Sequence, residues 1–207
     1  MIAEELIKKH RIISEQVDAR ELSIVLSKLE RSLLGGRQGN VVEFGCYIGT
    51  TSLFIARLLS QFNSGAAYHV YDSFEGLPEK SAKDASAAGD QFVKGELLAT
   101  KNQFVANFKK AGLQLPKIHK GWFADIQDQD VPDDIMFAFL DGDYYDSIKD
   151  SLNLIGNKLS DQSVIIIDDY SNEALPGAGK AVDEWLSSRQ NFSLKVQSSL
   201  AIITQHS

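Results

Sequence analysis

Two adjacent aspartates, Asp168 and Asp169, follow an unbroken aliphatic run in the stretch VIIIDDYSN. A third, Asp141, ends the similar run IMFAFLD, 27 residues before Asp168 (168 − 141). That separation fits one strand-helix-strand crossover, and adjacent parallel strands lie about 5 Å apart, so the three carboxylates can converge at one rim. Converging carboxylates repel one another unless a cation binds between them. Because all three offer hard oxygen ligands, we predict that Asp141, Asp168 and Asp169 bind Mg²⁺, or Mn²⁺ or Ca²⁺.

A divalent cation at this rim suits the chemistry of a hydroxyl group. An alcohol is a poor nucleophile because its pKa lies far above 7, and coordination to a cation lowers that pKa and orients the oxygen. We expect Asp141 also to accept the departing proton, with Asp143, Tyr144 and His119 as alternatives. Asp143 and Asp146 lie at the start of the next predicted helix. We interpret both as helix caps, and the alternative for the whole set is that the acids only cap helices and form turns.

A second motif, EFGCYIGTT at residues 43–51, follows another predicted strand and opens a helix. Gly45 and Gly49 permit a tight turn and a close ligand approach. Their spacing differs from the G-x-G-x-x-G of pyrophosphate binding and suits a smaller group, such as the amino-acid end of S-adenosylmethionine. Asp72 ends the next strand, 23 residues after Gly49 (72 − 49), where an acid can accept hydrogen bonds from ribose hydroxyls. The alternative interpretation is that Gly45 and Gly49 only form a turn and that Asp72 only ends a strand, without binding a ligand.

These residues need a scaffold that brings strand ends together. Apolar runs predict strands at 40–45, 67–72, 117–122, 135–142 and 163–169, and helical spacing predicts helices at 3–35, 50–62, 97–111, 145–159 and 179–189. Residues 192–206 are typical of a closing hairpin. Aliphatic runs without polar alternation indicate an α/β fold, whose parallel sheet is covered on both faces and binds ligands at the strand carboxyl ends. The long polar stretch at 73–95 predicts a mobile lid over residues 79–95.

Five motifs together resemble the macrocin O-methyltransferase family of class I S-adenosylmethionine-dependent methyltransferases. They are VVEFGCYIGTTS, YDSFEGLP, KGWFADI, FLDGDYYDS and IIDDYSNEALPGAGKAVDEW, between about Val41 and Trp185. The glycine turn is also similar to that of catechol O-methyltransferase. The resemblance implies a Rossmann-like fold with a mostly parallel seven-stranded sheet, helices on both faces and a C-terminal antiparallel hairpin. It also implies a divalent metal, usually Mg²⁺, and a hydroxyl acceptor, often on a sugar of a natural product.

The resemblance further implies a set of cofactor contacts: Glu43, Gly45 and Tyr47 around the methionine part, Thr51 at its carboxylate, Asp72 at the ribose, and Trp122 and Phe74 near the adenine. Core packing is the alternative for both aromatic residues, and we favour it for Phe74. We expect residues 1–36 to form an N-terminal helical segment and residues 37–207 to form the S-adenosylmethionine-binding domain.

Composition limits the partners. A chain of 207 residues with 43% hydrophobic and 24% charged residues fits a soluble globular domain. Its net charge of -7 argues against binding to nucleic acid or to an anionic membrane surface. The single cysteine, Cys46, and the absence of a signal-like apolar run suit a cytoplasmic protein. The sequence is compatible with a monomer and with a homo-oligomer.

The sequence therefore predicts a metal-dependent O-methyltransferase that uses S-adenosylmethionine and acts on a small-molecule hydroxyl. The alternatives are metal-independent methyl transfer and a non-catalytic module that binds S-adenosylmethionine. A third, an NAD-type oxidoreductase, is disfavoured by the missing G-x-G-x-x-G motif.

Overall fold

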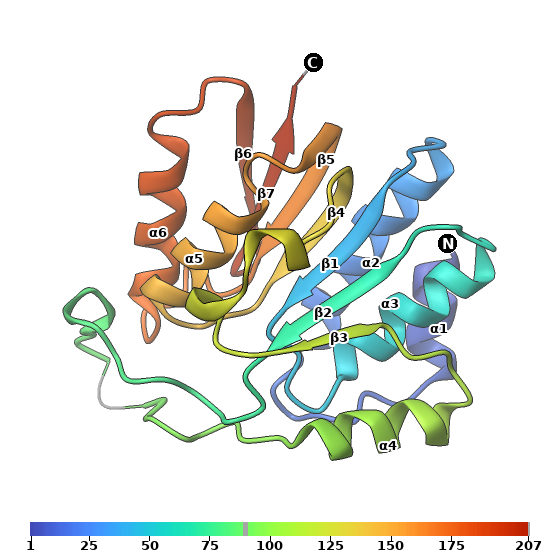
Figure 1. The fold of residues 1–207 in the computed structure, drawn as a ribbon, viewed down its shortest axis with the longest axis horizontal. Coiled ribbons are helices and arrows are strands. Elements are labelled where there is room, and N and C mark those ends of the chain that lie inside the picture. Colours follow the sequence, from blue (N-terminus) through green and yellow to red (C-terminus); the bar gives the residue numbers. More distant parts are fainter. Residues whose placement is uncertain (89–90, 207) are drawn as a thin grey trace.

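The computed structural model describes residues 1–88 and 91–206. Within them, one sheet has the strand order β3-β2-β1-β4-β5-β7-β6 (Figure 1). The strands are β1 (Asn40–Phe44), β2 (Tyr68–Asp72), β3 (Lys117–Lys120), β4 (Ile135–Leu140), β5 (Leu159–Ile167), β6 (Phe192–Gln197) and β7 (Leu200–Gln205). β1 to β5 run parallel, whereas β7 pairs antiparallel with β5 and β6 pairs antiparallel with β7. The predicted α/β sheet with its closing hairpin is confirmed.

Helices cover both faces of this sheet (Figure 1). They are α1 (Ile2–Lys9), α2 (Ala19–Leu34), α3 (Thr50–Gln61), α4 (Lys101–Ala111), α5 (Tyr145–Ile155) and α6 (Pro176–Leu186). Helices α1 to α4 share one core cluster with Val41, and α5 and α6 share the other with Val42. Because adjacent strand residues point to opposite, equally buried faces, the strands read as continuous aliphatic runs. In the part of the chain that the structure describes, no helix is long and apolar enough to span a membrane.

The N-terminal segment consists of two helices, whereas the sequence predicted helix throughout residues 3–35. Helix α1 ends because His10 adopts extended backbone, with φ −118° and ψ 143°. Helix α2 starts after Asp18, whose carboxylate accepts hydrogen bonds from the amides of Arg20 and Glu21 at 2.8 and 3.0 Å. An N-cap of this kind stabilises a helix start, so the apolar periodicity resumes in a separate helix.

The carboxyl ends of β1 and β4 meet closely. The Asp141 amide donates a hydrogen bond of 2.8 Å to the Phe44 carbonyl, which continues the pairing of Phe44 with Leu140. Gly45 follows with φ +86°, and a Cβ there would overlap the Asp141 carbonyl oxygen. Gly45 is therefore required both by its left-handed backbone and by the approach of the two strand ends.

We predict that Gly45→Ala lowers the free energy of unfolding by at least ~2 kcal/mol, because the new methyl group meets backbone that cannot rotate away. Gly65→Ala is the control, since a Cβ at Gly65 meets nothing within 4 Å. The control should change stability by no more than about 0.5 kcal/mol. Urea unfolding of both variants measures the difference, and equal effects would contradict the predicted contact.

Candidate functional site

A cavity of about 270 Å³ opens beyond the carboxyl ends of the central strands. Its lining includes nine residues that the sequence analysis assigned to the cofactor, the metal or catalysis: Glu43, Gly45, Tyr47, Thr51, Asp72, Trp122, Asp141, Asp168 and Asp169. Phe74 lies elsewhere, because its buried ring packs edge-on against Phe104 at a centroid distance of 6.0 Å. The cavity is also lined by the aromatic ring of Phe123, a residue of the motif KGWFADI to which the sequence analysis gave no role.

Asp72 connects the end of β2 to the turn that follows β1. Its Oδ2 accepts hydrogen bonds from the amides of Cys46 at 2.8 Å and Tyr47 at 3.2 Å. Its Oδ1 accepts a bond of 2.6 Å from the Phe74 amide. Tyr47 has a left-handed backbone, with φ +47°. A carboxylate has about four acceptor sites, so Asp72 holds the turn and keeps capacity for a ligand hydroxyl.

The start of α3 offers unused donors to the same cavity. Gly49 occupies the N-cap position with φ +87°, and no side chain caps the helix. A Cβ at Gly49 would lie 2.8 Å from the Phe104 ring, so glycine is needed here as well. Thr50 and Thr51 line the cavity, and the buried Thr50 hydroxyl has no hydrogen-bond partner among the described residues. This helix start therefore suits an anionic group such as a carboxylate.

Glu43 presents an unsatisfied oxygen at the floor of the cavity. Its side chain is fully buried, and its Oε2 accepts hydrogen bonds from the Tyr68 hydroxyl and, at 2.7 Å, from the Ser52 hydroxyl. Its Oε1 is buried and has no partner within the described chain. Burial raises the pKa of Glu43 to about 7, and the charge of Asp72 adds to this. A ligand ammonium group would supply the missing donor and favour the ionised form.

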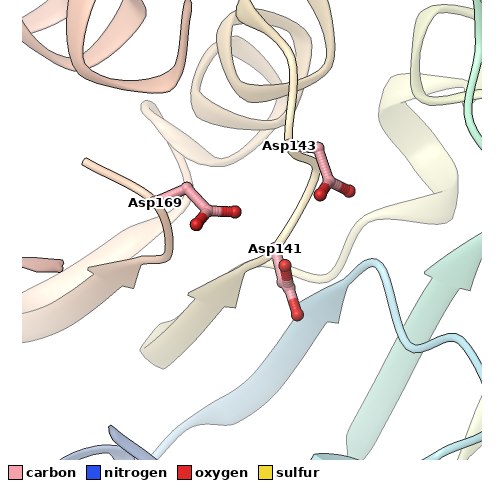
Figure 2. A group of neighbouring side chains, drawn as sticks. All are labelled: Asp141, Asp143 and Asp169. Carbon is pink, nitrogen blue, oxygen red and sulfur yellow. The ribbon is translucent and has the colours of Figure 1, made fainter. Parts of the chain in front are cut away.

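Three aspartates gather between the ends of β4 and β5. Each of Asp141, Asp143 and Asp169 has a carboxylate oxygen that lies within 4.8 Å of the other two (Figure 2). Burial raises the pKa of all three carboxyl groups, and neighbouring carboxylates raise those of Asp141 and Asp143 further. This crowding of hard oxygens is the donor set that Mg²⁺ or Mn²⁺ prefers.

The interpretation of Asp143 as a helix cap is wrong. Tyr144 is the N-cap residue of α5 and makes no side-chain capping bond. Asp143 adopts left-handed backbone, with φ +59°, and its carboxylate joins the cluster instead. The Tyr145 amide at the start of α5 donates a hydrogen bond of 2.7 Å to the Asp84 carboxylate. This amide therefore has an acceptor from another segment and needs no cap from Asp143. Asp146 does lie in the first turn of α5, where its charge suits the helix dipole.

Asp168 supports the cluster from the side of β5. Its Oδ1 accepts a hydrogen bond of 2.8 Å from the Asp169 amide and lies 3.4 Å from the Ser199 hydroxyl. That hydroxyl donates to Glu21 at 2.5 Å. Burial, followed by the charge of Asp169, raises the pKa of Asp168 to about 7. The sequence did not indicate Glu21 or Ser199, because Glu21 resembles an ordinary helix-start acid and Ser199 an ordinary turn residue.

The cavity is strongly acidic. Seven carboxylates line it: Glu21, Glu43, Asp72, Asp141, Asp143, Asp168 and Asp169. No lysine, arginine or histidine is among the described residues of its wall. The resulting field favours cations and disfavours anionic ligands.

We predict that Glu43→Gln removes part of the pH dependence of stability. The folded wild type keeps its proton up to about pH 7, whereas the unfolded chain releases it near the ordinary value of 4.5. The stability from this group is therefore full below 4.5 and is lost as the pH rises toward 7. Over that interval, the free energy of unfolding should fall by about 3 kcal/mol more in the wild type than in the variant. Urea unfolding in chelator measures both curves, and parallel curves would show that Glu43 is ionised in the folded protein.

Known proteins share this sequence pattern. The chain matches the macrocin-O-methyltransferase (TylF) family over residues 17–198. It is 34% identical over 154 residues to 8-demethyl-8-(2,3-dimethoxy-alpha-L-rhamnosyl)-tetracenomycin-C 4'-O-methyltransferase of Streptomyces olivaceus, a match that covers 70% of this chain and 58% of that protein. It is 28% identical over 155 residues to demethyldecarbamoylnovobiocin O-methyltransferase of Streptomyces niveus, with 71% and 58% covered. The chain thus spans less than two thirds of the length of these relatives.

Solved structures show the same fold. The O-methyltransferase NovP has a TM-score of 0.80 at 22% identity, with 92% of this chain and 81% of that chain covered. The calicheamicin methyltransferase CalS11 has a TM-score of 0.73 at 17% identity, with 98% and 90% covered. These likenesses confirm the Rossmann-like methyltransferase fold. With the family match over most of the chain, they confirm the resemblance seen in the motifs: this chain belongs to the macrocin O-methyltransferase family.

Proposed function

We propose that this protein is an S-adenosylmethionine-dependent O-methyltransferase that acts on a small-molecule hydroxyl with the help of a divalent cation. The observation that carries the proposal is one cavity that holds both the Asp72 turn and the cluster of Asp141, Asp143 and Asp169. Binding of the cofactor alone would not need the cluster, whereas activation of a hydroxyl would use it. Membership of the family, and the names of both relatives, support the same reaction.

The cofactor would lie along the ends of β1 and β2. When bound, it supplies a methyl group on a positively charged sulfur. Glu43 Oε1 would accept a hydrogen bond from its ammonium group, because that buried oxygen has no partner in the described structure. Thr51 and the uncapped start of α3 would hold its carboxylate, and Asp72 its ribose. Gly45 and Tyr47 would line the methionine part, and Trp122 the adenine.

We expect Asp72→Asn to weaken the binding of S-adenosylhomocysteine by about 1.5–3 kcal/mol, or roughly tenfold to 150-fold, because a charged acceptor for the ribose is lost. The asparagine keeps an oxygen for the amides of Cys46 and Tyr47, but its NH2 group then faces the Phe74 amide. Thermal unfolding of the variant therefore has to show first that the turn is still folded. Asp125→Asn is the control, since Asp125 is exposed and lies outside the cavity lining. Calorimetry measures both affinities, and an unchanged affinity in Asp72→Asn would remove this residue from the site.

The cation would be held by the aspartates at the ends of β4 and β5. When bound, it lowers the pKa of the acceptor hydroxyl and orients that oxygen. Asp141 and Asp169 belong both to the predicted ligand set and to the observed cluster of carboxylates, which supports them as ligands. A carboxylate engaged with a cation is a weak base, so we now propose Asp141 as a ligand rather than as the proton acceptor. Of Asp143 and Asp168, one would then be the third ligand and the other the proton acceptor.

Chelation should abolish methyl transfer, and Mg²⁺ should restore it. If the cation contributes about 4 kcal/mol to the transition state, its loss costs about a thousandfold in rate. Asp143→Asn and Asp168→Asn separate the two remaining roles. Loss of the ligand should weaken Mn²⁺ binding, measured by electron paramagnetic resonance, whereas loss of the proton acceptor should lower kcat at unchanged Mn²⁺ affinity. Full turnover in excess chelator would refute the cation and favour metal-independent transfer.

The acceptor should be an uncharged glycoside or related natural product. The relative from S. olivaceus is named for a rhamnosyl tetracenomycin, whereas CalS11 is described as acting on TDP-rhamnose. With Glu43 and Asp72 taken by the cofactor, a diphosphate on the acceptor would still share the cavity with Glu21 and the four aspartates at the ends of β4 and β5. The described cavity wall has no cationic side chain. One divalent cation offsets only part of that charge.

Neutral rhamnosides should therefore be methylated with a kcat/KM at least about a hundredfold higher than that of TDP-rhamnose, since unfavourable charge placement costs several kcal/mol. Release of S-adenosylhomocysteine measures the turnover of both acceptors under the same conditions. Comparable or faster turnover of the nucleotide sugar would contradict the argument from charge, while leaving the methyl transfer itself intact.

A further inference from the structure

We propose that Asp84 is a positioning residue for the carboxylate cluster. Its buried carboxylate caps α5 from outside that helix and thereby fixes the turn that carries Asp141 and Asp143. The effect on cation binding rests on the proposed function, whereas the effect on the turn does not. Asp84 lies in a short 3-10 helix, Ala82–Asp84, within the long segment that follows β2.

Both carboxylate oxygens of Asp84 are used, although the residue is only 1% exposed. Oδ1 accepts a hydrogen bond of 2.7 Å from the Tyr145 amide. Oδ2 accepts bonds from the Ser81 amide at 2.9 Å and from the Ser81 hydroxyl at 2.6 Å. An ionised carboxylate buried to this degree is costly unless its bonds are complete. The contact with α5 is therefore strong and specific in geometry.

The turn fixed by this contact is short. Only residues 141–144 join β4 to α5, and they include two of the three clustered aspartates. At its first end, the Asp141 amide bonds to the Phe44 carbonyl at 2.8 Å. At its second end, the Tyr145 amide bonds to Asp84, since no side chain of the turn caps the helix. A change at Asp84 would therefore reach Asp143 through two peptide units.

Helix α6 has a glycine, Gly177, where it passes the hydrogen bond between Asp84 and the Tyr145 amide. A Cβ at Gly177, in the first turn of α6, would overlap Asp84 Oδ1 and would lie 2.7 Å from the Tyr145 amide nitrogen. Glu184, further along α6, accepts hydrogen bonds from Lys83 at 2.6 Å and from the Tyr145 hydroxyl at 2.5 Å. The 3-10 helix is thus bound to both α5 and α6.

The segment predicted as a mobile lid makes further contacts of this kind, and its mobility stays a prediction. In its described residues, 79–88 and 91–95, the chain is tied to the helices beside it at several points. Besides Asp84, the Ser86 hydroxyl donates to the Glu173 carbonyl at 2.5 Å, and the Phe92 carbonyl accepts from the Tyr144 hydroxyl at 2.5 Å. Gly89 and Asp90, which also belong to the predicted lid, lie outside the described residues. These hydrogen bonds hold the described residues of the segment against the start of α5 and the turn before α6, beside the aspartate cluster.

The test compares Asp84→Asn with Glu184→Gln. Each variant replaces one carboxylate among the contacts of the 3-10 helix with α5 and α6. Only Asp84→Asn places an NH2 group against either the Tyr145 amide or the Ser81 amide, because each of these amides uses a different oxygen of Asp84. Glu184 contacts the Tyr145 hydroxyl but not its amide. Hydrogen exchange in the peptide that spans residues 141–148 should become at least tenfold faster in Asp84→Asn and should stay within about twofold of the wild type in Glu184→Gln. Mn²⁺ should bind at least tenfold more weakly to Asp84→Asn than to the wild type, and should bind Glu184→Gln as it binds the wild type. The affinity of the Asp84→Asn protein for S-adenosylhomocysteine should stay unchanged.

The outcomes separate the two proposals. Unchanged exchange at 141–148 in a folded Asp84→Asn protein would overturn the positioning role. Faster exchange with unchanged Mn²⁺ affinity would also overturn it, because the turn would then not control the cluster. Wild-type protein that binds no Mn²⁺ would contradict the proposed function, and the exchange data would still decide whether Asp84 holds the turn. If Asp84→Asn does not fold, Ser81→Ala takes its place, since it removes only one bond to Oδ2 and should give a smaller change of the same kind.

Discussion

Four aspartates lie at the rim where β4 and β5 end, and their mutual repulsion is the constraint that the surrounding structure has to meet. Asp141, Asp143, Asp168 and Asp169 are half-buried, and their partial burial raises the pKa of each. No lysine, arginine or histidine offsets them in the described wall of the cavity. The protein instead uses weaker dipoles, such as the Asn172 amide group, which donates to Asp169 at 2.8 Å. Under the proposed function, a bound cation would offset the repulsion that remains.

The order of strands explains how that cluster comes to face the Asp72 turn. Outward from β1, the chain proceeds to β2 and β3 on one side and to β4 and β5 on the other. Ligands bind at such a switch point because the connections from the two central strands leave in opposite directions. The Asp72 turn therefore lies on one side and the aspartates on the other. Gly45 brings the two halves into backbone contact at Asp141.

Much of this could be predicted from the sequence, because local patterns carry it. The run at Ile135–Leu140 is buried at every position, so its apolar composition indicates both the strand and its two covered faces. Asp141 and Asp169 follow such strands directly and could be assigned to the rim. The break between α1 and α2 was missed, because apolar periodicity continues across it and only the cap at Asp18 marks the new start.

The remaining site residues depend on contacts between distant segments. From its position in the sequence, Asp143 resembles a helix cap. In the structure, the first amide of α5, that of Tyr145, donates instead to Asp84, which lies 61 residues away in the sequence. Glu21 reaches Ser199 across a sequence separation of 178 residues. No periodicity or motif records such pairs, and each is formed by side chains that have ordinary local explanations. Sequence patterns thus located the rim, while the packing of helices against the sheet decided which oxygens face one another there.

The most direct test of the account is anomalous scattering from manganese in crystals grown with Mn²⁺ and S-adenosylhomocysteine. We predict one strong anomalous peak among the carboxylates at the ends of β4 and β5, from manganese bonded to oxygens of Asp141 and Asp169. We also predict that the cofactor product lies beside this peak, with its ribose at Asp72. Bound product without an anomalous peak at this rim, or with manganese bound elsewhere on the chain, would contradict the claim that these aspartates form a cation site.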